Sequence, residues 1–387
     1  PSKHIIQKAE LELQSARKRI NYISLLRLVL YVCAIAGAVT FSADGWLYIS
    51  VFAILPFILF VWLVKRHNFW FHRKDFLKKK IVINEQELRA IQYDFSDFED
   101  GEEYIDSGHL YTFDLDVFGE HSLFQYINRT STPVGKQHLA DWFNSHLENK
   151  EAIEQRQEAI RELSTELEYR QQIRLLGLLY KGKPADTTEI KTWADSPSYY
   201  RKHTLLRIIP ITVSIINLVC ISLAFSGILP ASAAGGVFIS FVIFSSVFSK
   251  GITKLQTTYG KKLQILSTYA DQILLTEKKE MHSPILQQLK AELTSQNQTA
   301  SQAVRQLSKL MNALDQRSNL LMSTILNGLI FWELRQVMRI EQWKDTHAKD
   351  LPRWIETIGE IDAYCSLATF AYNHPEYIYP KICSQSF

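Results

Sequence analysis

The run from Gly177 to Pro184 has the spacing closest to a chemical site in this sequence of 387 residues. It reads Gly-Leu-Leu-Tyr-Lys-Gly-Lys-Pro, so Gly177, Gly182 and Lys183 have the spacing of a phosphate-binding loop. Such a loop also needs a Ser or Thr hydroxyl after the lysine, to bind Mg²⁺, and a strand before its first glycine. Pro184 supplies no hydroxyl, and a helical pattern precedes Gly177. The sequence therefore predicts a turn that ends a helix here, and no cofactor bound by this chain.

Cysteine, histidine and carboxylate side chains give no second site. The cysteines lack the Cys-x-x-Cys spacing of zinc and dithiol sites; they are Cys33, Cys220, Cys365 and Cys383. His121, His138 and His146 also lack ligand spacing, which favours surface or capping roles over a metal site. Asp114 and Asp116 could be catalytic carboxylates, although a solvated edge is the favoured interpretation. No nucleophile, base and orienting acid stand together, so we predict no catalytic residue.

The longest uncharged stretch covers residues 208–249, without one Asp, Glu, Lys or Arg. About 20 apolar residues span a bilayer as a helix, so this stretch is long enough to cross twice. Turn-forming Gly and Pro within Ser226–Pro230 divide it. The sequence therefore predicts a transmembrane helical hairpin at 204–249, in which Gly235 and Gly236 permit close approach of the two helices.

A similar pair of uncharged runs lies near the N-terminus. Leu28–Ala43 and Gly45–Val64 meet at the turn signal Ser42–Gly45, and they predict a first transmembrane hairpin at about 25–64. Lys and Arg flank both hairpins at their outer ends, whereas neither connecting turn contains one. The positive-inside rule then places both turns outside and both termini in the cytoplasm, as in a multi-pass protein of the cytoplasmic (inner) membrane. Two very apolar core hairpins of a soluble protein are the alternative.

Basic and aromatic residues are interleaved directly after the first predicted hairpin. They are Lys65, Arg66, Phe69, Trp70, Phe71, Arg73, Lys74, Lys78, Lys79 and Lys80. Such a mixture can bind nucleic acid. Next to a spanning helix, we interpret it as an anchor on anionic lipid headgroups with an aromatic belt. The net charge of the whole chain, +3, is too small to imply a nucleic-acid partner.

The remaining segments have mainly helical patterns. Thr132 with Pro133, and Asn149, are typical helix starts. Apolar residues recur at steps of three and four from Ile252 to Ile273 and from Val304 to Leu314, as in long antiparallel helices or a coiled-coil arm. The sequence therefore predicts a mainly α fold, a long-helix core and lever bundle with two transmembrane hairpins. We expect the parts on either side of the second hairpin to pack into one unit.

Three further elements are predicted within these segments. Leu110–Phe118 alternates, with Phe113, Leu115 and Val117 on one side, and predicts a short half-buried strand or an extended lead-in. Leu320–Trp343 is apolar on most sides and predicts one buried helix. Asp350 and Pro352 start a last helix, which we expect to end before Pro375.

Several motifs in these segments resemble the core domain of MutS, the DNA mismatch-repair ATPase family. In Leu115–Leu139, a lead-in and a threonine-rich turn precede a helix with a Gly-basic pair. Trp142-Phe143 and Arg156–Ile160 continue the resemblance, and Ile361–Ala368 is similar to the base of the family's returning lever helix. The residues that we expect to form the structural core motif are Thr132, Pro133, Gly135, Arg156 and Ile160. Thr132 caps a helix and Pro133 starts it, Gly135 allows close approach of another helix, and Ile160 fills a core.

The resemblance covers roughly residues 107–200 and 250–387 and implies that this chain is the N-terminal, non-catalytic part of a membrane-anchored MutS-like protein. An ATPase domain would follow Phe387 and bind ATP and Mg²⁺ in the full-length protein. Its expected partners are membrane lipid, its own C-terminal ATPase domain, DNA and a second copy in a homodimer. The alternative is a membrane-embedded helical scaffold or adaptor without DNA binding. A small transporter is a third hypothesis, which the sequence disfavours because the uncharged runs contain no Asp, Glu, Lys, Arg or His.

The chain departs from the family at its N-terminus, where the family has a mismatch-sensing domain with a Phe-x-Glu motif. Phe118-Gly119-Glu120 and Phe331-Trp332-Glu333 fit those three letters by chance, so mismatch recognition is not expected. The resulting division is residues 1–75 with the first hairpin, 76–203 as the first part of the core, 204–249 as the second hairpin, and 250–387 as lever-like helices that return to the core.

Overall fold

The computed structural model describes residues 2–40, 46–179, 184–255, 265–294, 299–315 and 320–382. Within these ranges the regular elements are helices, and the only β pairing is an isolated bridge between Thr294 and Thr299. The predicted mainly α fold is confirmed. The chain forms two compact units, Pro1–Glu99 and Asp100–Phe387.

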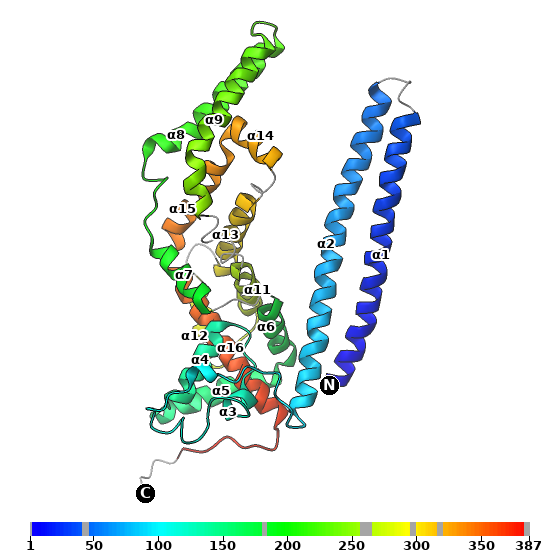
Figure 1. Ribbon diagram of the computed structural model, residues 1–387. Coiled ribbons are helices and arrows are strands. Elements are labelled where there is room, and N and C mark those ends of the chain that lie inside the picture. The colour runs from blue at the N-terminus through cyan, green and yellow to red at the C-terminus, as the bar shows by residue number, and fades with distance from the viewer. Residues whose placement is uncertain are drawn as a thin grey trace. The chain divides into compact units, whose positions relative to one another are not determined.

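The first unit is an antiparallel hairpin of two long helices, α1 (Ser2–Thr40) and α2 (Trp46–Ala90) (Figure 1). Its buried cluster, on which Trp70 packs, is Ala9, Leu13, Ala16 and Leu77. Closer to the turn, large apolar side chains are exposed, among them Leu28 at 60% and Leu55 at 65%. The predicted turn at 42–45 lies outside the described residues. The hairpin is therefore packed like a coiled pair at one end and has an apolar exterior near the other.

The second unit begins with turns and short helices. They are η1 (Glu102–Tyr104), α3 (Leu123–Ile127), α4 (Pro133–Asn144), α5 (Lys150–Thr165), α6 (Leu167–Leu179) and α7 (Pro184–Asp195). The Thr132 hydroxyl accepts the Gly135 N–H at 3.0 Å, and the Asn149 side chain accepts the Glu151 N–H at 2.8 Å. Both predicted helix starts are confirmed, because each cap satisfies an orphan donor of the first turn.

Of the two alternatives predicted for Leu110–Phe118, a strand or an extended lead-in, the strand is wrong. The segment consists of turns, and Asp116 has a left-handed backbone with φ 46°, which interrupts an extended chain. On the alternating side, Phe113 and Leu115 are 49% and 69% exposed, and Val117 alone is buried. The segment is a lead-in whose last apolar residue enters the core.

A second hairpin, α8 (Thr204–Phe225) and α9 (Ala231–Leu255), rises from this unit at the predicted position (Figure 1). The expected close approach at Gly235 and Gly236 is wrong, because a Cβ at either would meet nothing within 4 Å. The tight glycine is Gly328, where a Cβ would clash with Phe238 of α9. The close contact is thus made between the hairpin and a third helix.

Among the described residues, three helices are long and apolar enough to cross a membrane. They comprise Ser2–Gly37, Thr204–Phe225 and Ala231–Phe248. The last two match the predicted second hairpin, and the first overlaps the predicted run Leu28–Ala43 over Leu28–Gly37. The fourth predicted span, Gly45–Val64 in α2, includes side chains outside the description and stays a prediction.

Six further helices of the second unit follow the second hairpin in the described residues. They are α11 (Ile265–Lys278), α12 (Pro284–Glu292), α13 (Ala300–Asp315), α14 (Leu320–Ile330), α15 (Trp332–His347) and α16 (Asp350–Asn373). The last helix begins and ends as predicted. The single helix predicted over Leu320–Trp343 is wrong, because buried Phe331 adopts a left-handed φ of 51° and separates α14 from α15. The Asn327 side chain accepts the Glu333 N–H at 3.0 Å and so caps α15 across the break.

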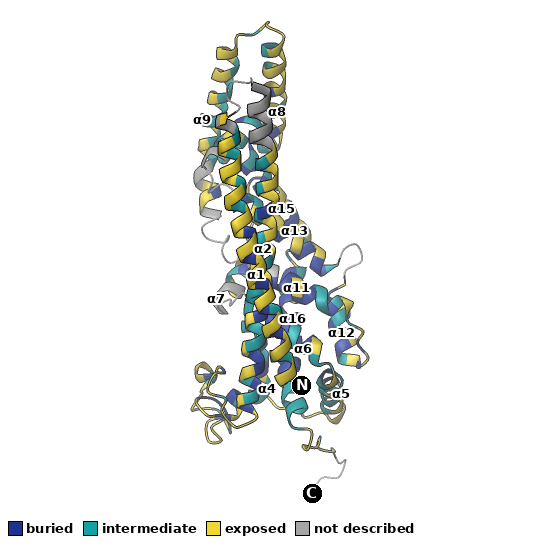
Figure 2. Ribbon diagram, turned by 90° about the vertical axis from the view of Figure 1, so that its right-hand side faces the viewer, coloured by how far each residue is buried: buried dark blue, intermediate teal, exposed yellow. Residues whose placement is uncertain are grey.

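One large hydrophobic cluster joins residues from both sides of the second hairpin, which confirms the expected single unit. Leu163 and Ile173 precede the hairpin, Leu266, Ile340 and Ile358 follow it, and all five are fully buried in this cluster. Of the predicted apolar seam, Tyr259 and Leu263 lie outside the described residues. Figure 2 shows buried residues gathered along α16 and its neighbours, whereas exposed residues dominate α1 and α2.

Candidate functional site

The centre of the second unit is a buried carboxylate on α16. Asp362 is 1% exposed and accepts four hydrogen bonds from the turn before α4. Ser131 N–H, Thr132 N–H and the Thr132 hydroxyl donate at 2.8 Å, and the Ser131 hydroxyl donates at 3.1 Å. Burial raises the pKa of Asp362, and the bonds from Ser131 and Thr132 oppose that rise. The carboxylate ties two segments that are about 230 residues apart in the sequence.

Two glycines allow α4 and α16 to approach closely at this point. A Cβ at Gly135 would lie 2.5 Å from Asp362 Oδ2, and one at Gly359 would clash with Val134. Pro133, the first residue of α4, has no N–H to leave unpaired. Thr132, Pro133 and Gly135 of the predicted motif therefore meet at one helix crossing.

Arg156 and Ile160 lie on α5, beside the same helix α16. The Arg156 guanidinium lies 4.3 Å from the centre of the Trp142 ring, and that ring is 4.6 Å from the Tyr364 ring. Ile160 is partly buried against the large hydrophobic cluster. The five motif residues thus lie at contacts of α4 and α5 with neighbouring elements.

A second polar cluster links α4, α7 and α16. Glu356 accepts from Lys191 Nζ at 2.5 Å and contacts His138 Nε2 at 3.0 Å. The hydrogen bond to His138, followed by that to Lys191, lowers the pKa of Glu356 to about 2, while burial opposes this. Glu356 in turn raises the pKa of His138. His138 therefore has a structural role through its contact with Glu356, which sequence spacing alone did not indicate.

The residues first considered for chemistry are placed in helices or turns. Gly177 is buried in α6, where a Cβ would clash with Ser131, whereas Gly182 and Lys183 lie outside the described residues. Asp114 and Asp116 are exposed in the turns before α3. Burial raises the pKa of the Cys365 thiol, which disfavours its use as a nucleophile. The described part of the chain has no group of three or more His, Cys, Asp or Glu that could hold a metal ion.

The phenylalanines of the two Phe-x-Glu sequences are both buried. Phe118 is 7% exposed and packs in the small cluster with Phe124, and Phe331 is 1% exposed at the α14–α15 break. A buried phenyl ring cannot insert between bases.

Polar side chains join the second hairpin to the helices that follow it. Asn217 is buried in the middle of α8, and its Nδ2 donates to the carbonyls of Gly328 at 3.0 Å and Leu329 at 3.1 Å. These carbonyls belong to the last turn of α14, which has no intrahelical donors for them. Sequence analysis missed this contact, although an amide within an apolar span was its visible signal.

An arginine on α15 reaches the same hairpin. Arg335 Nη2 donates to the Pro210 carbonyl at 2.7 Å and to the Ser214 hydroxyl at 2.8 Å, and its Nε donates to the Ile330 carbonyl at 2.9 Å. One guanidinium therefore bonds both α8 and the end of α14. We call Asn217, Arg335 and their partners the hairpin joint.

The predicted basic and aromatic belt lies entirely on α2. Arg66 lies over Phe69 and Trp70, and Lys74 lies 3.5 Å from the centre of the Phe71 ring. These contacts are cation–π pairs, which hold the basic groups on the helix surface beside the rings. The residues nearest the predicted span stay candidates for a headgroup anchor.

The far end of this belt extends along the helix axis. Because α2 is continuous, Lys78 lies about 20 Å from Lys65 along the axis at 1.5 Å per residue. That is more than twice the screening length of about 8 Å at physiological salt. Arg73 meanwhile pairs with Glu12 of α1 at 2.7 Å. The distal lysines Lys78, Lys79 and Lys80 are therefore less suited to a headgroup contact than Lys65 and Arg66.

The helices around Val304–Leu314, part of the predicted long helices or coiled-coil arm, pack within the unit over their described residues. The α11 and α13 helices pack on each other, and α12 packs against α5 and α16. Lys279 pairs with Glu166 at 2.7 Å, and Arg305 pairs with Asp271 at 2.8 Å. These pairs leave less positive charge available for phosphate.

Comparison with known proteins identifies this architecture. A family model for MutS domain III matches residues 109–368, from the turns before α3 to within α16, and includes the second hairpin. No curated protein and no solved structure matches the chain. Since the matched region exceeds half of the chain, the protein belongs to the MutS family.

Proposed function

We propose that the protein is the membrane-anchored, non-catalytic part of a mismatch-repair-type ATPase, in which the helices of domain III couple an ATPase domain to the membrane. ATP and Mg²⁺ would bind in that following domain, and a homodimer would place two such units together. Both hairpins would span the cytoplasmic membrane with their turns outside.

The hairpin joint is the observation that supports this proposal. The membrane-length hairpin α8–α9 interrupts the region that matches domain III, and Asn217 and Arg335 bond it to α14 and α15. Helix α15 continues through the core to α16, which Asp362 ties to the start of α4. Movement of α16 would therefore be carried to the hairpin through packed helices and defined hydrogen bonds.

Cysteine labelling tests the membrane topology. In a variant whose native cysteines are replaced by Ala, we expect Ile228→Cys at the α8–α9 turn to react with an impermeant maleimide in intact cells. Ile228 is 74% exposed, and Tyr199, before α8, is 64% exposed and serves as the matched position. Tyr199→Cys should react only after permeabilisation. Protection of Ile228→Cys in intact cells would contradict the topology.

A distance measurement tests the coupling. Spin labels at Ile228 and at exposed Glu154 of α5 would report the position of the hairpin relative to the core in the full-length protein. ATP with Mg²⁺ should shift the distance distribution in the parent protein. Asn217→Leu should reduce that shift while ATP hydrolysis continues. A distance distribution that does not change when ATP and Mg²⁺ are added to the parent protein would exclude coupling.

A helical scaffold without DNA binding is the second candidate, and the paired charges on α11–α13 favour it over DNA binding. A protein that neutralises phosphates loses affinity steeply as salt rises. Fluorescence anisotropy with duplex DNA at two salt concentrations distinguishes the candidates. Salt-dependent binding that Lys278→Ala with Lys309→Ala weakens would support DNA contact, whereas no binding in low salt would support the scaffold.

A further inference from the structure

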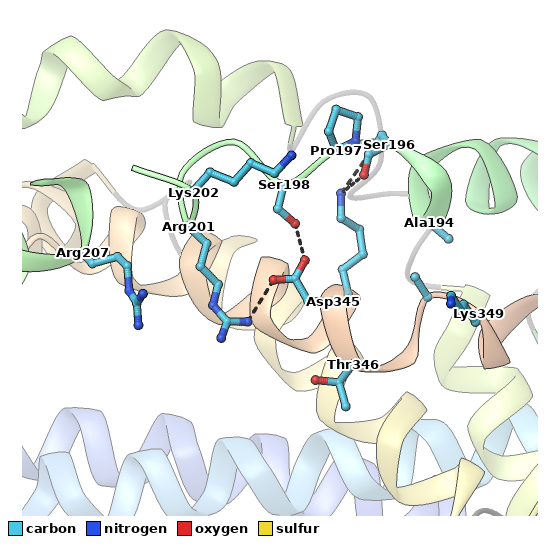
Figure 3. A pocket seen from close by; sticks show the side chains of 12 residues that line it. Ala194, Ser196, Pro197, Ser198, Arg201, Lys202, Arg207, Asp345, Thr346 and Lys349 are labelled. Atoms are coloured by element: carbon cyan, nitrogen blue, oxygen red, sulfur yellow. Dashed lines mark hydrogen bonds and ion pairs between the residues drawn. The ribbon is translucent and has the colours of Figure 1, made fainter. Parts of the chain in front are cut away.

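A basic cavity lies at the base of the second hairpin, where the α7–α8 connection faces the end of α15. Its volume is about 750 Å³, which is within the range of ligand pockets. Figure 3 shows Ser198, Arg201 and Lys202 on one side and Asp345 and Lys349 on the other. The two sides come from segments more than 130 residues apart, so the fold alone assembles this site.

Positive charge dominates the lining. The basic residues are Arg201, Lys202, Arg207, Lys344 and Lys349, against the single carboxylate of Asp345. That carboxylate is already occupied, since it accepts from the Ser198 hydroxyl at 2.6 Å and from Arg201 at 3.0 Å. Lys202, Arg207 and Lys349 have no carboxylate partner among the described residues.

A buried lysine adds charge behind this surface. Lys344 is 5% exposed, and its Nζ donates to the Ser196 carbonyl at 2.7 Å and to the Ser196 hydroxyl at 3.1 Å. Glu341 lies nearby, but its carboxylate accepts from the N–H groups of Tyr199, Tyr200 and Arg201. The connection is therefore held rigidly, with an ammonium group behind its outer cations.

The position of the cavity selects the kind of anion. Lys202 precedes the first residue of α8, Thr204, and Arg207 lies in the first turn of that membrane-length helix. Leu205 and Ile208 beside them are 77% and 48% exposed. Cationic groups therefore border an exposed apolar surface, an arrangement that matches a phosphate headgroup followed by acyl chains. A soluble phosphate compound would make no use of that apolar surface.

We propose that this cavity binds the phosphate headgroup of an anionic membrane lipid, with Lys202, Arg207 and Lys349 contacting the phosphate. The proposal rests on the proposed membrane insertion of α8–α9. It gives domain III a lipid-sensing contact directly beside the helix that leads into α16.

Lipid retention tests the proposal. The full chain, purified in a neutral detergent, is incubated with phosphatidylglycerol or phosphatidylcholine, and native mass spectrometry measures the bound lipid. We expect selective retention of phosphatidylglycerol. Lys202→Ala with Arg207→Ala and Lys349→Ala should weaken it on the order of 100-fold, since each cation near an anionic lipid contributes about a factor of five.

A matched variant separates the site from overall charge. Lys150→Ala with Lys278→Ala and Lys309→Ala removes three exposed cations of the same unit outside the cavity, and it should retain the lipid like the parent. Lys202→Arg with Lys349→Arg should also retain it. Equal loss in both triple-alanine variants, or undiminished retention in the cavity variant, would overturn the proposal.

Two further measurements distinguish a lipid from a soluble phosphate compound, and failure of this inference from failure of the proposed membrane insertion. Inorganic phosphate should not displace the lipid, and displacement at comparable concentration would overturn the lipid assignment in favour of a soluble phosphate compound. Carbonate extraction of membranes tests insertion independently. Extraction of the parent chain would contradict the proposed membrane insertion itself, whereas resistance to extraction without phosphatidylglycerol selectivity would refute this inference alone.

Discussion

The α1–α2 and α8–α9 hairpins are both apolar and flanked by basic residues, but they are held in different ways. The first forms a unit of its own, with a small cluster around Ala16 and Leu77. The second interrupts domain III and is bonded to α14 and α15 by Asn217 and Arg335. Apolar packing holds the first hairpin together, whereas buried polar bonds at a defined position make the second hairpin part of the structure that it interrupts.

The largest expected effect tests whether the two units are independent. Asp362→Ala should destabilise the second unit by about 3–5 kcal/mol, because four donors from Ser131 and Thr132 lose their buried acceptor. Hydrogen exchange measured by mass spectrometry should show faster exchange in α4 and α16 and unchanged exchange in α1 and α2. The exposed Asp141→Ala is the control and should change little. Loss of protection in α1–α2 as well would contradict their independence.

A smaller effect is expected at the hairpin joint. Asn217→Leu removes the donor for the Gly328 and Leu329 carbonyls and should cost about 1–2 kcal/mol, because two buried carbonyls lose a hydrogen-bond partner. Amide exchange near the α14–α15 break should accelerate. Ser240→Ala on α9 is the matched control, because that hydroxyl bonds only its own helix, at Gly236 O. Equal acceleration in both variants would show that the joint is not specific.

Features whose causes lie within a few neighbouring residues could be predicted from the sequence. Both pairs of apolar helices and the helix caps at Thr132 and Asn149 are of this kind. The break at Phe331 is not, since neither Gly nor Pro marks it and its support comes from Asn327 and the packing of α14 on α9.

In the candidate sites, too, residues within local patterns could be predicted, whereas their distant partners could not. The motif residues Thr132 and Gly135 could be named from local patterns, but their partner Asp362 is about 230 residues away. The basic cavity combines residues 194–207 with residues 344–349, and neither segment has a motif of its own. Alternation at Leu110–Phe118 misled because turns, with a left-handed Asp116, expose two of its three apolar residues.

A pH dependence should appear in the second unit through Glu356 and His138. The depressed pKa of Glu356 stabilises the fold above its ordinary value of 4.5, and this contribution is lost as pH falls towards about 2. The raised pKa of His138 stabilises the fold below 6.5, and this contribution is lost as pH rises through the raised value. Because these side chains are partly exposed, solvent screening limits the effect to about 1 kcal/mol.

Denaturant unfolding across this pH range measures the effect. The free energy of unfolding of the second unit should be greatest between about pH 4.5 and 6.5 and should decline at lower and at higher pH. Glu356→Gln should flatten both declines. Glu154→Gln, which removes the exposed ion pair with Lys150, should leave both declines unchanged. An unchanged profile in Glu356→Gln would exclude this cluster as the cause.

The smallest effect is expected in the first hairpin, where Arg73 and Glu12 form an exposed ion pair at 2.7 Å. Arg73→Ala should cost only about 0.3 kcal/mol, because exposed pairs gain little after screening and loss of side-chain freedom. Leu13→Ala, in the buried cluster, should cost about 2 kcal/mol or more. A double-mutant cycle with Glu12→Ala, followed by hydrogen exchange of α1, measures the coupling. A coupling energy near that of Leu13→Ala would mean that the first hairpin, like the second, depends on specific polar bonds.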